Sequence, residues 1–253
     1  MTEPTKRLRS VDTLRGITIL SMIAFHTCWD LVYFNLGLEA SFLNSRGAYI
    51  WQQSICYTFI LLSGYCFSMG HHHIKRAAMS LGGGILITLV TLLLIYDERD
   101  VFGVLWMLGT SSFLMILLDR VFPKSKRGAA VGLAVSIVLF LLTRNINIGQ
   151  LGFEGFKICN LPPELYKGYV MTFLGFTDPE FYSSDYFSLI PWFFLFTTGY
   201  FLHKMLKDTL FEKKLAVFGI RPLEFIGRHS FIIYMLHQVV IYGVTYLIFL
   251  CVR

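Results

Sequence analysis

Seven long apolar runs restrict the possible folds of this chain more than any other feature of its sequence. A helix needs about 20 residues to cross the roughly 30 Å hydrocarbon core of a bilayer. Seven segments approach this length, so the sequence predicts seven membrane-spanning helices. They are residues 13–33, 49–69, 78–96, 101–118, 128–143, 187–206 and 230–252.

Composition supports a membrane protein. Of the 253 residues, 55% are hydrophobic and only 15% are charged, whereas ordinary soluble domains carry roughly 25% charged residues. A soluble fold of this size has too little interior to hide so much apolar surface. We therefore expect an all-α, polytopic integral membrane bundle that forms a single domain over residues 1–253.

The net charge of +6 reflects membrane topology rather than nucleic-acid binding. Basic residues cluster between the apolar runs, as the positive-inside rule requires. With the N-terminus inside, 16 of the 22 basic residues lie on the inner side. This distribution predicts an N-terminus inside, a C-terminus outside and no nucleic-acid partner.

Two connections are long. The outer one, residues 144–186, is rich in aromatic residues and Pro, so we expect it to fold over the outer opening of the bundle. It either caps or shapes a substrate site, or is a plain packed connection. The inner one, residues 203–228, has the alternating apolar and basic pattern of an amphipathic segment at the membrane interface.

Ionisable groups inside spans are costly, so they are candidates for function. His26 and Asp30 are spaced i, i+4 on the first span and share one face. An imidazole held by a carboxylate is a competent general base. A structurally paired, buried histidine is the alternative interpretation.

The last span carries a polar stripe of Ser230, Tyr234 and His237, spaced i, i+4, i+7. Hydrogen bonding between helices alone explains such a stripe equally well. His26 and His237 are expected to line one tunnel at different depths, without a requirement for contact. Arg15 is either an anchor at the inner interface or a guanidinium that faces the bundle and binds phosphate.

Several motifs together resemble the heparan-alpha-glucosaminide N-acetyltransferase catalytic family, in particular its short bacterial members, within a broad group of transmembrane acyltransferases. They cover nearly the whole chain in order, and the opening motif is the most specific. They are residues 9–16 (RSVDTLRG) with His26 and 29–30 (WD), 59–64 (FILLSG), 102–105 (FGVL), 181–187 (FYSSDYF) with 191–192 (PW), and 227–230 (GRHS) with 237–238 (HQ).

The resemblance implies an enzyme that transfers an acetyl group from cytoplasmic acetyl-CoA to a sugar amine or hydroxyl outside. It also implies a multi-pass protein of the bacterial cell membrane and a possible homodimer. The animal enzyme's catalytic histidine belongs to the first outer loop, but residues 31–69 contain no histidine, so His26 would serve. Bacterial relatives often have histidine in the fourth span, where this chain has Trp106.

The resulting hypothesis assigns a role to each candidate residue. His26, oriented by Asp30, deprotonates the acceptor or receives the acetyl group, and His237 lines the tunnel and stabilises the oxyanion. No metal is expected, since the adjacent residues 71–73 (HHH) cannot share one helical face. The remaining assignments are Arg9, Arg15, Arg228, Ser230 and Tyr234 for acetyl-CoA, and Trp29, Trp192 and Asp185 for the acceptor.

Two other classes of function remain open at the level of sequence. In a small-molecule or lipid-linked sugar transporter or flippase, the same His and Asp residues bind substrate or relay protons. In a structural membrane subunit, the polar stripes only hold partner helices. The lack of an internal repeat disfavours a transporter built from duplicated halves.

Overall fold

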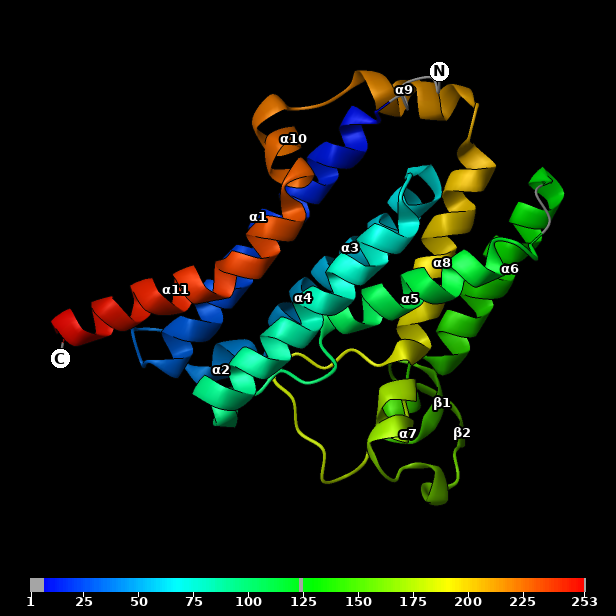
Figure 1. Cartoon of the computed structure of the whole chain (residues 1–253). Helices are drawn as coiled ribbons and strands as arrows, with labels where there is room; N and C mark the ends of the chain where they lie inside the picture. Colours follow the sequence, from blue (N-terminus) through cyan, green and yellow to red (C-terminus); the bar gives the residue numbers. More distant parts are fainter. Residues whose placement is uncertain (1–6, 123–124, 253) are drawn as a thin grey trace. The chain divides into compact units, whose positions relative to one another are not determined.

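The computed structural model describes residues 7–122 and 125–252, most of which are helical (Figure 1). The α-helices are α1 (Arg9–Tyr33), α2 (Ala40–Leu43), α3 (Arg46–Met69), α4 (His73–Leu94), α5 (Val104–Leu118), α6 (Lys126–Thr143), α7 (Tyr169–Leu174), α8 (Leu189–Leu206), α9 (Leu210–Val217), α10 (Arg221–Arg228) and α11 (Ser230–Val252). The shorter elements are the 3-10 turns η1 (Tyr96–Glu98), η2 (Ile146–Ile148) and η3 (Pro163–Leu165), and the strands β1 (Gln150–Phe153) and β2 (Phe156–Asn160).

A helix occupies each of the seven predicted apolar segments: α1, α3, α4, α5, α6, α8 and α11. Among the described residues, four helical stretches are long and apolar enough to cross a membrane: α1, α4, α6 extended to Ile148, and α11. α5 is apolar but shorter. It begins after the predicted residue 101, because Phe102 has a left-handed backbone conformation, with a φ of 59°. The seven-span topology and its orientation stay predictions.

The chain divides into two compact units, each described here by itself. The first contains the described residues up to Phe59 and from Asp208 onward. The second runs from Ile60 to Lys207, and α3 contributes residues to both.

In the first unit, α1 packs against α9, α10 and α11. Two glycines allow the close contact between α1 and α10. A Cβ atom on Gly16 would collide with the backbone carbonyl of Leu223, and one on Gly227 with that of Asp12. The packing therefore joins the opening motif of the chain to the motif that precedes the last span.

The first half of α3 completes this unit. Trp51 Nε1 donates a hydrogen bond to Ser21 Oγ on α1 at 2.8 Å, and the Trp51 ring meets Phe25 edge to face. Phe59 stacks on Tyr234 of α11, with ring centroids 5.9 Å apart. These contacts fix α3 against both α1 and α11.

In the second unit, α4 packs on α5, and α6 packs on α8. α3 and α8 approach closely because each contributes a glycine to the contact. Gly64 of α3 lies against the backbone of Phe196, and Gly199 of α8 lies against the backbone of Leu61. Residues 144–186 form the antiparallel β1–β2 hairpin, α7 and the turns η2 and η3. Asn147 fastens this segment by donating to the Gly175 carbonyl at 3.0 Å. Its capping role stays a prediction.

Candidate active site

Two histidine rings face each other inside the first unit. His26 on α1 and His237 on α11 have ring centroids 5.0 Å apart, with the ring planes inclined at 62°. His237 is only 8% exposed, and His26 is partly buried. The sequence predicted that both histidines line one tunnel but did not require contact. The structure brings them together because α1 packs along α11.

The backbone carbonyl of Tyr234 determines which nitrogen of His237 carries the proton. His237 Nδ1 lies 2.6 Å from this carbonyl oxygen. A carbonyl oxygen only accepts hydrogen bonds, so Nδ1 must be the donor. In the neutral ring, Nε2 then holds the lone pair that accepts a proton. His237 is therefore equipped to act as a general base.

Asp30 lies one turn beyond His26 on α1, and Gln238 lies one residue beyond His237 on α11. Asp30 is 2% exposed, and its Oδ1 accepts a hydrogen bond from Gln238 Nε2 at 3.1 Å. The role of Asp30 in orienting His26 stays a prediction. The sequence interpretation gave Gln238 no role, although an amide beside His237 in an apolar helix was an available signal.

The predicted polar stripe on α11 does form one buried face. Ser230, Tyr234 and His237 are 2%, 8% and 8% exposed. Trp29, assigned to the acceptor, is 40% exposed on α1. The stripe therefore faces other helices of the first unit, whereas the Trp29 ring is accessible.

The three predicted phosphate-binding arginines gather where α1, α10 and α11 meet. Arg9 Nη2 lies 2.8 Å from Glu224 Oε1, and Arg228 Nη2 lies 3.6 Å from Glu224 Oε2. Arg15 Nη2 donates to Ser230 Oγ at 2.5 Å. Glu224, which sequence reasoning missed, is only 6% exposed, and its i, i+4 spacing to Arg228 was the available signal. It holds two guanidinium groups that each remain 41% exposed.

Trp192 and Asp185 belong to the second unit. Trp192 is 5% exposed, and its ring packs against Phe187 at 5.2 Å, with the Arg144 guanidinium 5.1 Å from its centroid. A sugar would have to displace one of these groups to stack on Trp192. The assignment of both residues to the acceptor stays a prediction.

A second carboxyl group, Asp100, lies near Asp185 and was missed by sequence reasoning. Its backbone N–H donates to Thr91 Oγ1 at 3.0 Å. Burial, reinforced by the negative charge of Asp185, raises the pKa of Asp100 to about 8. Burial therefore favours the protonated form of Asp100 over the carboxylate more than in an ordinary aspartate. The only feature of the sequence that could have indicated Asp100 is its position just before a predicted span.

The fold and the buried polar groups together define a helical membrane protein with ionisable side chains on two of its candidate spans, α1 and α11. The chain belongs to the family described as heparan-alpha-glucosaminide N-acetyltransferase, catalytic, whose model matches residues 7–239. Membership in this family makes the chain a transferase of the membrane acetyltransferase class. Comparison with curated proteins and with solved structures gave no match.

Proposed function

We propose that this protein transfers an acetyl group from cytoplasmic acetyl-CoA to a sugar amine or hydroxyl on the opposite side of the bacterial cell membrane. The observation that carries the proposal is the contact between the His26 and His237 rings within a chain of the acetyltransferase family. Two imidazoles inside apolar helices are costly to bury, and acyl transfer uses such groups as bases and acyl acceptors. The proposal requires no metal.

His26 and His237 divide the proton transfers in this mechanism. His26 deprotonates the acceptor or receives the acetyl group itself. Because Nδ1 of His237 donates to the Tyr234 carbonyl, Nε2 stabilises an oxyanion only after it has taken up a proton. The new bond joins the acetyl carbon to the acceptor oxygen or nitrogen. In direct transfer, the C–S bond breaks and the departing thiolate takes the proton that His26 removed from the acceptor. If His26 receives the acetyl group first, the C–S bond breaks as the bond from His26 to the acetyl carbon forms. The acceptor then attacks, that N–C bond breaks, and His237 passes the acceptor proton to the thiolate.

The arginine cluster holds the phosphates of CoA in this proposal. Arg9 and Arg228 are partly exposed while anchored on Glu224; Arg9 keeps one N–H for a phosphate after its bonds to Glu224, Val217 and Gly219, whereas Arg228 keeps more. From Arg15 to His26 the distance along α1 is about 16 Å at the helical rise. The pantetheine arm has to span this distance between the helices, with Tyr234 lining its path.

The test uses the full chain, purified and placed in lipid nanodiscs, with radiolabelled acetyl-CoA and a panel of amino sugars and neutral sugars. Wild type is expected to release CoA and to label an acceptor or itself. His26→Ala and His237→Ala should each lower the rate at least 100-fold, the usual contribution of a positioned base. The exposed His71→Ala is the matched control and should keep the wild-type rate.

Binding measurements distinguish residues that bind acetyl-CoA from residues that act in acetyl transfer. Arg9→Gln should weaken acetyl-CoA binding, whereas His26→Ala should leave the dissociation constant near its wild-type value. The enzyme proposal fails if wild type neither binds nor hydrolyses acetyl-CoA. Transport of a sugar or lipid-linked sugar without acetylation would instead establish the transporter alternative.

A further inference from the structure

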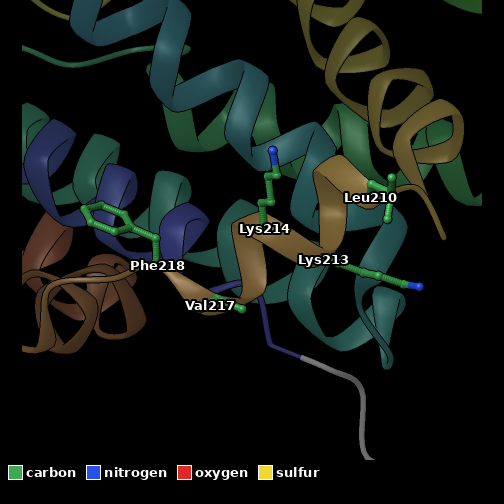
Figure 2. A pocket seen from close by; sticks show the side chains of 5 residues that line it. All are labelled: Leu210, Lys213, Lys214, Val217 and Phe218. Atoms are coloured by element: carbon green, nitrogen blue, oxygen red, sulfur yellow. The ribbon is translucent and has the colours of Figure 1, made fainter.

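The exposed face of α9 combines apolar and basic side chains. Leu210, Lys213, Lys214 and Val217 follow the i, i+3, i+4, i+7 spacing of a single helical face. Together with Phe218 they line an open pocket (Figure 2). The apolar members are far from buried, since Leu210 is 77%, Val217 75% and Phe218 67% exposed. Both lysines are exposed as well. In water alone, this face would leave a large apolar area unprotected.

The pocket is fastened to the start of α1. Arg9 Nη1 donates to the Val217 carbonyl at 3.2 Å, and Ser10 Oγ donates to the Phe218 carbonyl at 2.8 Å. α9 therefore lies across the N-terminal end of α1 (Figure 1). These bonds hold the C-terminal end of α9 at a fixed height along the α1 axis.

The candidate spans predict that this height corresponds to the boundary of the membrane. α1 and α11 are both candidate spans, and the Arg15–Ser230 hydrogen bond joins the beginning of one to the beginning of the other. Both spans thus enter the bilayer at the end of the first unit that carries α9. A short helix at this level meets lipid headgroups and the adjoining parts of the acyl chains.

We infer that the α9 pocket is a binding site for the phosphate headgroup of an anionic phospholipid. Lys213 and Lys214 supply the positive charge, and Leu210, Val217 and Phe218 contact the apolar part of the lipid. A free nucleotide phosphate has no acyl chain and would leave these three side chains in water.

The neighbouring acidic side chain does not oppose this ligand. Glu212 Oε2 accepts a hydrogen bond from the backbone N–H of Asp208 at 2.7 Å. The carboxylate is thereby directed to the start of α9. The charged side chains that line the pocket are Lys213 and Lys214, which complement an anionic headgroup.

Native mass spectrometry of the full chain in an uncharged detergent tests the site. Phosphatidylglycerol and phosphatidylcholine of equal chain length are added at equal concentration, and bound lipid is counted. Wild type should retain phosphatidylglycerol preferentially. Lys213→Gln/Lys214→Gln should weaken this binding about 30-fold, the expected effect of two interfacial charges. Lys213→Arg/Lys214→Arg should keep it.

The matched control is Lys157→Gln/Lys167→Gln, which removes the same charge from exposed positions of the second unit and should bind like wild type. Equal retention of the two lipids by wild type would overturn the inference, as would an unchanged preference in the Gln variant of α9. Displacement of phosphatidylglycerol by acetyl-CoA would assign the pocket to the nucleotide instead. Because the assay involves no acetyl transfer, its result is independent of the proposed activity.

Discussion

Replacement of Gly227 by Ala tests the packing that assembles the candidate active site. A Cβ atom there would lie 2.9 Å from the carbonyl carbon of Asp12 and 3.1 Å from the backbone nitrogen of Gly16, with the Asp12 carbonyl oxygen closer still. Carbon atoms in contact are normally about 3.5–4.0 Å apart, so α10 must move away from α1 by about 1 Å. Because backbone cannot rotate aside like a side chain, we expect a loss near the upper end of the overpacking range, about 3 kcal/mol.

The unfolding temperature of the protein in nanodiscs measures this loss. A change of about 3 kcal/mol lowers the midpoint by about 6–12 °C in a chain of this size. The displacement also separates Arg15 from Ser230, so acetyl-CoA binding should weaken in parallel. Gly243→Ala is the matched control: it lies in α11 with no atom within 4 Å of the added Cβ. Alanine is the better helix former, so this control should unfold at or slightly above the wild-type temperature.

The contrary outcome is a Gly227→Ala protein that unfolds at the same temperature as the Gly243→Ala control. Such a result would mean that α10 does not pack on α1 at the observed distance. A lowered unfolding temperature with unchanged acetyl-CoA affinity would instead separate the packing of α10 from phosphate binding.

Three further substitutions test other parts of the structure by the same unfolding measurement. Glu224→Gln removes the charge that two half-exposed guanidinium groups share, and should cost about 1–2 kcal/mol, an effect that high salt should reduce. Gln238→Met removes the amide donor from the buried Asp30 carboxylate and should cost about 2 kcal/mol, whereas a silent substitution would contradict that hydrogen bond. Burial raises the folded-state pKa of Asp100 to about 8, so the folded state binds more protons than the unfolded state between about pH 4 and pH 8. Relative to Asp100→Asn, wild type should therefore lose stability as the pH rises through this window, whereas the exposed Glu164→Gln should keep the wild-type pH dependence.

The helices and the class of protein could be predicted from the amino-acid sequence. Apolar runs near the length of a membrane crossing predicted the seven long helices of the described residues, because a segment in lipid must satisfy its backbone hydrogen bonds within itself. Spacing also predicted which residues share a helical face, and Ser230, Tyr234 and His237 form one buried stripe. The opening motif indicated the family, which the match over residues 7–239 confirmed.

Which helix faces pack against each other becomes visible in the folded chain alone. Apolar surfaces that face lipid and those that face a partner helix have the same composition, so periodicity does not name the partner. The contact between His26 and His237, the Gln238 amide on Asp30 and the buried Glu224 all depend on helices more than 170 residues apart in the chain. Backbone contact at Gly227 sets the packing of α10 on α1, and this contact exists only in the folded chain.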